Sequence, residues 1–208
     1  MTIKINYKNN ISKTDLSNLV LFVDEKFNIL DLKKHISNLD YLYILDLLKT
    51  KDNKKKILIF HINSKKKITL VSLKKGISNS GIEKLGAKFF DISKDFKQNN
   101  IILNSDTIPD KLKDYIGYFL HGYRLKSYTF DKYKSKKTKK KISISVIGKN
   151  KFSSKEQLKF KALEEGTFYT RDLVSEPGNI LHPDEYAKRL KSLSKVGLKI
   201  NIYDEKKL

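Results

Sequence analysis

The sequence predicts an α/β fold, in which helices cover both faces of a β-sheet. Six short segments rich in β-branched and aromatic residues are separated by longer segments with apolar residues at helical spacing. Strands that alternate with helices in this way are typical of a sheet packed between helical layers. A hydrophobic content of 39% over 208 residues is sufficient for a packed core.

The expected strands cover residues 2–7, 19–24, 57–62, 68–73, 101–103 and 142–147. Each is short, and most are rich in isoleucine, leucine and valine, residues that favour the extended backbone. The third and fourth strands flank residues 63–67, a polar five-residue segment. Such a loop suits an antiparallel hairpin, so we expect these two strands to pair.

Three stretches between the strands each carry one apolar face at helical spacing. The first face comprises Ile36, Leu39, Leu42 (or Tyr43) and Leu47, the second Ile82, Leu85, Phe89, Ile92 and Phe96, and the third Leu112, Tyr115 (or Ile116), Phe119 and Tyr123. We expect each face to pack against the sheet.

A long helix follows the last strand. Ser153 and Glu156 form a capping box, and the helix they open runs to about Val174, a length of roughly 30 Å. After a break at Pro177 and Gly178, a second helix is expected from Pro183, and residues 198–203 alternate as a strand. The predicted organisation is therefore a domain over residues 1–150, a linker helix over 151–175, and an incomplete second α/β unit over 176–208.

The net charge of +21 comes from lysine. Only three of the 44 basic residues are arginines, which leaves 41 lysines, whereas nucleic-acid readers favour the planar fork of arginine. We therefore expect most of the charge to be solvated surface. The alternative is a nucleic-acid contact through the lysine tract of residues 132–141. The candidate contact residues in that tract are Lys136, Lys137, Lys139, Lys140 and Lys141.

The usual catalytic signatures do not occur in the sequence. The four histidines are far apart, without carboxylates at metal-ligand spacing, and are expected at the surface or at helix caps. Gly81 and Gly86 have the spacing of a phosphate loop but lack the Lys-Ser or Lys-Thr that must follow. Asp106 follows a strand, where open sheets bind ligands, but the nearby Pro109 favours a turn with an Asp helix cap.

Targeting and redox signals are also missing from the sequence. There is no cysteine, and therefore no disulfide or thiolate metal site. No apolar run approaches the length of a membrane span, and the N-terminus lacks the apolar region of a signal peptide. A cytoplasmic location without membrane attachment is expected.

Two segments resemble a known family. Residues 171–183, R-D-L-V-S-E-P-G-N-I-L-H-P, resemble the R-D-L-V-N-x-P-x-N-x-L-T-P segment that opens the catalytic domain of the leucine aminopeptidases (cytosol aminopeptidases). Residues 120–137 resemble the family's G-x-x-L-x-x-Y-x-F-x-x-Y-K-x-K-K segment. Ser175, Gly178 and His182 replace the family's Asn, Ala and Thr, and His182 is a poorer N-cap than Thr.

The resemblance implies an N-terminal domain with a macro-domain-like mixed sheet between helices, followed by a long linker helix. It also implies a C-terminal peptidase domain with two divalent metals (manganese, zinc or magnesium), held by a lysine and several carboxylates. The family's ligand motifs have no counterpart in this sequence, so no catalytic and no metal-binding residue is assigned. The chain is expected to be an inactive portion of an enzyme that cleaves peptide substrates.

The resemblance also bears on assembly and on other ligands. Family members form homo-hexamers, chiefly through the peptidase domain, whereas this chain is expected to be monomeric or to aggregate through its unpaired tail strand. Some members bind DNA, which agrees with the alternative of a lysine-rich nucleic-acid-binding domain. A third hypothesis is a macro-domain-like module for an ADP-ribose-type ligand, against which the missing glycine-rich phosphate loop argues.

Overall fold

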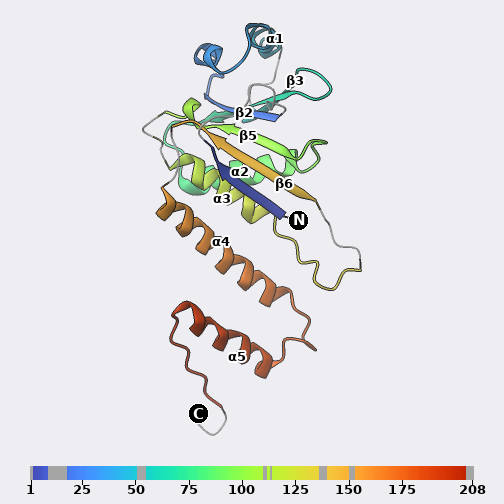
Figure 1. Ribbon diagram of the computed structural model, residues 1–208, viewed down its shortest axis with the longest axis vertical. Helices are drawn as coiled ribbons and strands as arrows, with labels where there is room; N and C mark the ends of the chain where they lie inside the picture. The colour runs from blue at the N-terminus through green and yellow to red at the C-terminus, as the bar shows by residue number, and fades with distance from the viewer. Residues whose placement is uncertain are drawn as a thin grey trace. The chain divides into compact units, whose positions relative to one another are not determined.

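A six-stranded mixed sheet forms the centre of the first part of the chain (Figure 1). Its strands are β1 (Thr2–Tyr7), β2 (Asn18–Asp24), β3 (Ile57–His61), β4 (Lys67–Leu73), β5 (Asn100–Asn104) and β6 (Lys141–Ile147), in the order β1-β6-β5-β2-β4-β3. Neighbouring strands run parallel, except that β3 pairs antiparallel with β4. All six predicted strands and the predicted hairpin are thus confirmed.

The computed structural model describes residues 2–8, 18–50, 55–109, 112, 114–135, 140–149 and 153–204. Its internal contacts divide the chain into two units, Met1–Glu164 and Glu165–Leu208. The sheet belongs to the first unit. In that unit the central strand β2 is buried over six of its seven residues, as expected for a parallel strand with helices on both faces.

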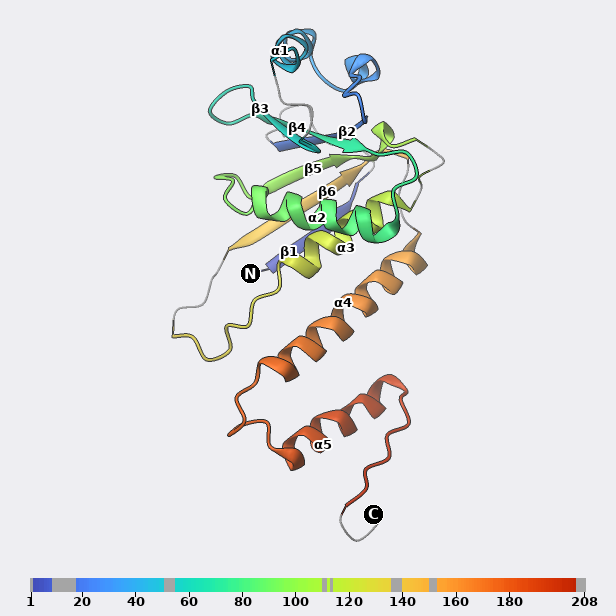
Figure 2. The same cartoon turned by 180° about the vertical axis from the view of Figure 1, so that it is seen from behind.

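Helices cover both faces of the sheet, as the sequence predicts (Figures 1 and 2). On one face lie α2 (Asn79–Ser93) and α3 (Tyr115–Lys126), which share a core with Val20, Phe22 and Ile144 of the sheet. On the other face lie a 3₁₀ turn, η2 (Leu30–Lys34), and α1 (Asn38–Leu48), which share a second core with Leu19, Leu21 and Leu70. The predicted apolar faces of α2 and α3 are confirmed, since Leu85, Phe89, Phe119 and Tyr123 are buried.

Two glycines set the close approach of α2 and α3. A Cβ at Gly86 would lie 1.9 Å from the carbonyl oxygen of Phe119, and one at Gly122 would lie 2.0 Å from that of Glu83. Any side chain at either position would overlap the backbone of the opposite helix. Gly86 therefore has a packing role, which explains its presence in a segment that only partly matches a phosphate loop.

The face that α1 buries differs from the prediction. The structure buries Asp40, Tyr41 and Ile44, whereas Leu39 is 81% exposed and Leu42 is 52% exposed. The prediction failed because apolar residues surround the whole helix, so their spacing does not single out one face. Contacts with other segments decide it, among them the ion pair between Asp40 and Lys66 of the β3–β4 loop.

The long helix α4 spans Ser154–Ser175, close to the predicted bounds. Its capping box is confirmed: Ser153 N donates to Glu156 Oε2 over 3.0 Å, and Glu156 N donates to Ser153 Oγ over 3.3 Å. The Ser153 hydroxyl, which donates to Glu156 Oε2 over 2.7 Å, and the Ser153 N–H together hold the pKa of the Glu156 carboxyl below its usual value. The first part of α4, to Glu164, belongs to the first unit.

In the second unit, α5 (Pro183–Lys191) continues into the 3₁₀ helix η5 (Ser192–Val196). Gly197 ends this helix with a left-handed backbone, φ 91°, as its sequence position predicts. The predicted strand over residues 198–203 is wrong, since the described residues 198–204 have no regular structure. An isolated strand has no partner for its backbone hydrogen bonds, so the described part of the predicted second α/β unit contains helices and an irregular segment but no strand.

Candidate functional site

The lysine tract is partly engaged in structure. Lys136, Lys137 and Lys139 lie outside the described residues. Lys140 Nζ donates to the backbone carbonyl oxygens of Lys94 and, at 3.3 Å, Phe96, just beyond the C-terminus of α2. A cation is favourable there because the carbonyls at a helix C-terminus lack partners. Lys140 is thus tied to the fold, and Lys141 is the exposed first residue of β6.

At the C-terminal edge of the sheet, polar side chains hold two loops together. Asn104, at the end of β5, accepts a hydrogen bond from Asp106 N through Oδ1 and contacts His35 Nδ1 through Nδ2 at 3.0 Å. Asp106 Oδ1 accepts from Lys149 N at 2.6 Å. Asn104 rather than Asp106 is therefore the cap of the 3₁₀ turn η3 (Ser105–Thr107), which corrects the predicted Asp cap.

The protonation of His35 is coupled to this contact. Because Asn104 Oδ1 is already an acceptor, the amide group donates to His35 Nδ1, which must be unprotonated to accept. Burial lowers the pKa of His35, while the nearby Asp106 carboxylate opposes the shift. The neutral imidazole therefore belongs to the folded state. With its acceptor nitrogen occupied by Asn104, His35 has a structural role at this edge.

A small pocket of about 190 Å³ lies among β1, α3 and the first turns of α4. It is lined by Tyr7, His121, Arg124, Glu164 and other residues. Arg124 Nε lies 2.7 Å from Glu164 Oε2, and His121 Nδ1 lies 3.6 Å from Glu164 Oε1. Glu164 is 4% exposed and His121 is 7% exposed, so the expectation of a surface or capping histidine is wrong for His121.

The electrostatics of this pocket favour a structural role. The guanidinium of Arg124 compensates the buried carboxylate of Glu164, which would otherwise be costly to desolvate. Burial and, to a smaller extent, the Glu164 carboxylate raise the pKa of Tyr7 to about 12, so its phenol stays protonated at neutral pH. The lining residues contain no serine, threonine or cysteine nucleophile. The pair fastens α4 to α3, and sequence reasoning missed it because 40 positions separate its two members.

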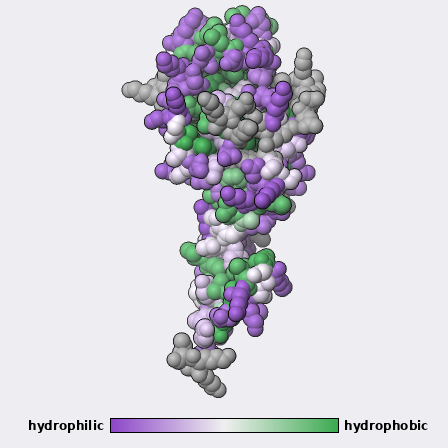
Figure 3. Space-filling model, turned by 90° about the vertical axis from the view of Figure 1, so that its left-hand side faces the viewer, coloured by the Kyte–Doolittle hydropathy of each residue, from purple (hydrophilic) through white to green (hydrophobic). Residues whose placement is uncertain are grey.

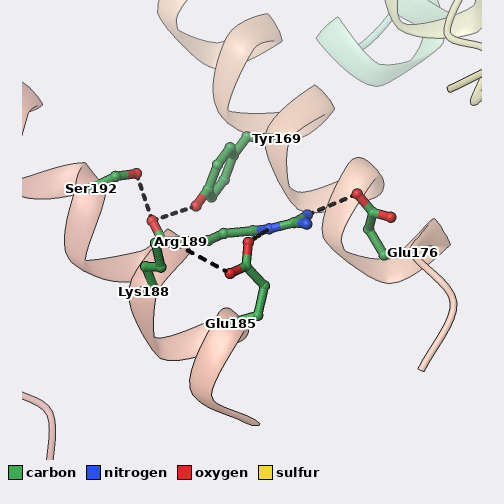
Figure 4. A network of polar contacts seen from close by, with 6 residues as sticks. All are labelled: Tyr169, Glu176, Glu185, Lys188, Arg189 and Ser192. Atoms are coloured by element: carbon green, nitrogen blue, oxygen red, sulfur yellow. Dashed lines mark hydrogen bonds and ion pairs between the residues drawn. The ribbon is translucent and has the colours of Figure 1, made fainter. Parts of the chain in front are cut away.

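The segment of residues 171–183 forms the end of α4, a turn, and the start of α5. Glu176, just after α4, accepts from Arg189 Nη1 over 2.8 Å, and Glu185 accepts from Arg189 Nε over 2.9 Å. Figure 4 shows the guanidinium held between the two carboxylates. Tyr169 of α4 donates its hydroxyl to the carbonyl oxygen of Arg189 over 2.8 Å. These contacts define how the two helices of the second unit meet.

The N-terminus of α5 has the weak cap that the sequence suggests. His182 is the N-cap, with extended backbone angles, and its side chain makes no capping hydrogen bond. Pro183 occupies the first turn, where its missing N–H costs nothing. Arg189 compensates from the other end of the helix, and the two carboxylates raise its pKa further above the usual value. Arg189 thus links the segment after α4 to α5.

The described residues do not fit a metal centre. No group of three or more His, Cys, Asp or Glu side chains in the described ranges could hold a metal ion. The carboxylates near α3 and α4 are already engaged, since Glu164 pairs with Arg124 and Asp91 with Lys94 and Lys126. A two-metal site holds its ions about 3.5–4 Å apart, so several carboxylates must converge on one place. Within the described ranges, no helix is long and apolar enough to cross a bilayer.

Comparisons with known proteins agree with the resemblance. No protein-family model matches the chain. A probable cytosol aminopeptidase of Clostridium perfringens is 27% identical over 196 residues, which are 89% of this chain and 38% of that protein. One of Caulobacter vibrioides is 40% identical over 92 residues, which are 40% of this chain and 18% of that protein.

Solved structures share the fold. A tomato leucine aminopeptidase variant has a TM-score of 0.75 at 20% identity, over 99% of this chain and 45% of its own. The bottromycin maturation enzyme BotP with manganese has a TM-score of 0.64 at 13% identity, over 92% of this chain and 39% of its own. The chain spans less than half the length of each of these relatives. In sequence and in fold, the chain is similar to the N-terminal portion of leucyl (cytosol) aminopeptidases.

Proposed function

We propose that the complete protein is a metal-dependent leucyl aminopeptidase, which removes N-terminal amino acids from peptides, and that this chain serves it as scaffold. The match to the Clostridium protein carries the proposal, because it extends over 89% of this chain but only 38% of the relative. In this assignment residues 1–150 are the N-terminal domain, 151–175 the linker helix, and 176–208 the start of the peptidase domain.

The metals belong to the part of the enzyme that this chain does not span. The complete enzyme would use two divalent ions, manganese, zinc or magnesium, to activate water and polarise the peptide carbonyl. The described carboxylates of this chain do not converge, so no ligand is assigned among them. Peptide binding and hexamer formation are likewise assigned to the remainder. We propose a cytoplasmic location, which the name of the relatives, cytosol aminopeptidase, supports.

An assay of the pure chain tests this division of labour. Leucine p-nitroanilide with manganese should release no chromophore, while the complete Clostridium enzyme serves as the positive control. Turnover by the 208-residue chain that is abolished by a chelator would show that it holds a metal site and would overturn the proposal. Retention of a metal ion after dialysis, measured by elemental analysis, would do the same without any substrate.

Nucleic-acid binding is the alternative function. With Lys140 engaged at the end of α2, the contact would rest on Lys141 and on the tract lysines outside the described residues. Such a contact neutralises phosphates, so its affinity would fall steeply as salt rises and would show little sequence preference. A gel-shift titration at physiological salt decides: absence of binding leaves the charge as solvated surface.

A further inference from the structure

The pocket among β1, α3 and the first turns of α4 has the composition of a ligand site. All of its lining residues belong to the first unit. Its apolar walls are Ile5, Leu120 and Phe160. Much of the surface of the first unit in Figure 3 is hydrophilic, and the apolar walls set the pocket apart from it. Apolar walls with a small number of polar groups are typical of sites for small molecules.

Two polar groups of the pocket have hydrogen-bond donors to spare. A guanidinium carries five N–H donors, of which a carboxylate in fork geometry takes two. Arg124 therefore keeps donors for a second acceptor while its Nε lies 2.7 Å from Glu164 Oε2. The Tyr7 hydroxyl makes no hydrogen bond to any residue that the structure describes, and its pKa of about 12 keeps its proton in place. The ion pair is structural, yet the pocket still offers donors to a ligand.

The charge of the pocket favours a ligand with one negative charge. Arg124 and Lys161 contribute two positive charges and Glu164 one negative charge, so positive charge is in excess. Glu83 faces His121 Nε2 at 3.9 Å but does not line the pocket. A single carboxylate would balance the excess. A phosphate group, with close to two negative charges at neutral pH, would be repelled more strongly by Glu164 and would leave the apolar walls uncovered.

The volume of the pocket limits the size of the ligand. Its volume of about 190 Å³ is below the range of about 300–1,000 Å³ that drug-sized ligands occupy. A cavity of about 150 Å³ is sufficient for benzene. The pocket therefore suits a molecule slightly larger than benzene and is too small for a nucleotide.

We propose that this pocket binds a small aliphatic carboxylate. The carboxylate group of the ligand accepts hydrogen bonds from the Arg124 guanidinium and the Tyr7 hydroxyl. Its branched hydrocarbon chain packs against Ile5, Leu120 and Phe160. Because β1, α3 and α4 all contribute to the lining, the bound ligand would also hold the first turns of α4 in place. The proposal goes beyond the aminopeptidase assignment and does not depend on it.

A titration of the full chain with isocaproate, followed by nitrogen–proton correlation NMR, tests the proposal. We expect saturable shifts at the amides of β1, α3 and the start of α4, with a Kd of about 1 mM, as is reasonable for a ligand of so few atoms. Isocaproamide has the same shape without the charge. It should bind about tenfold more weakly, because its hydrogen bonds to the pocket are no longer charge-assisted.

Two variants of the pocket and one control locate the site. Tyr7→Phe removes the hydroxyl but keeps the ring, and should weaken isocaproate binding about tenfold. Ile5→Phe enlarges a wall of the pocket and should abolish binding. Tyr43→Phe is the matched control, since Tyr43 lies on α1 and donates to the carbonyl oxygen of His61 over 3.4 Å, outside the lining of the pocket. Unchanged thermal unfolding of the three variants shows that each is folded.

Several results would overturn the proposal. Absence of shifts at about 20 mM isocaproate, roughly twenty times the expected Kd, means that the pocket does not bind this class of ligand. Equal affinity for isocaproamide means that the carboxylate is not recognised. Equal affinity for inorganic phosphate at the same amides means a general anion site without use of the apolar walls. Binding that Tyr7→Phe and Ile5→Phe leave unchanged places the ligand elsewhere.

Discussion

The crossing of α2 and α3 provides the sharpest test of the packing. We consider Gly122→Ala, which adds one methyl group at the contact between the helices. The new Cβ would lie 2.0 Å from the carbonyl oxygen of Glu83, and 2.6 Å from its carbonyl carbon and Cα. All three are backbone atoms of α2, so no side-chain rotation relieves the overlap. The helices must separate by about 1 Å or more, since non-bonded carbon atoms prefer about 3.5–4.0 Å.

The magnitude follows from two opposing contributions. Alanine is favoured over glycine within a helix by up to about 1 kcal/mol. Overpacking of a core costs about 1–3 kcal/mol and occasionally more, and backbone overlap belongs to the upper part of that range. We expect a net loss of about 2 kcal/mol in the free energy of unfolding. For a protein of this size, that loss lowers Tm by roughly 4–8 °C.

Thermal and urea unfolding followed by circular dichroism provide the assay. Gly166→Ala is the matched control, because Gly166 lies in helix α4 and nothing would lie within 4 Å of its Cβ. It should stabilise α4 by up to about 1 kcal/mol, the helix-propensity difference alone. If Gly122→Ala leaves Tm unchanged or raises it as Gly166→Ala does, the two helices do not depend on glycine at their crossing.

Three further outcomes are expected. Arg124→Met should lower the free energy of unfolding by about 3 kcal/mol, because it leaves Glu164 as a buried unpaired charge. The double variant Arg124→Met with Glu164→Leu should recover most of that loss in urea unfolding. Additive losses from the two substitutions would contradict the pairing. Because the pKa of His35 is lowered in the folded state, the unfolded chain should take up a proton on His35 before the folded chain does as pH falls below about 6.5. The contribution of neutral His35 to the free energy of unfolding is fully present above that pH and should decline on acidification. His35→Gln should flatten this part of the pH profile. The same decline should be smaller in Asn104→Ala, which removes the donor to His35 Nδ1; an identical profile would mean that the contact does not contribute. Lysine lacks the planar guanidinium with which Arg189 donates to Glu176 and Glu185 at the same time. Arg189→Lys should therefore increase the rate of limited proteolysis between α4 and α5, with the cleavage products identified by mass spectrometry. An unchanged rate would contradict the role of this residue.

The elements that sequence reasoning located correctly are those encoded locally. The six strands coincide with runs of β-branched and aliphatic residues, and the capping box at Ser153 and Glu156 requires only residues three apart. The apolar stripe of α2 is also a local pattern, because Glu83, Lys84 and Lys88 occupy other sides of that helix. In α3 the predicted stripe is buried together with most of the rest of the helix. Where one face is clearly apolar, periodicity alone is sufficient to orient a helix.

The features that sequence reasoning missed depend on distant partners. For α1 the stripe through Leu39 and Leu42 was placed in the core, whereas the structure exposes it, since the helix is apolar on all sides. The tail segment was given a strand, although a strand needs a neighbour to pair with. Likewise Lys140 was placed in a solvated tract, and the carbonyl groups that it contacts lie more than 40 positions away.

The sequence by itself determined the α/β class, the order of the elements and the likeness to the leucyl aminopeptidases, because each is carried by short patterns or by a motif of adjacent residues. Only the tertiary structure decided that Gly86 and Gly122 form a helix crossing, that Arg124 neutralises Glu164, and that Leu39 and Leu42 of α1 are exposed. The physical reason is that close packing and charge compensation act through space. They depend on which backbone and side-chain atoms the fold brings within a few ångströms, whatever their separation along the chain.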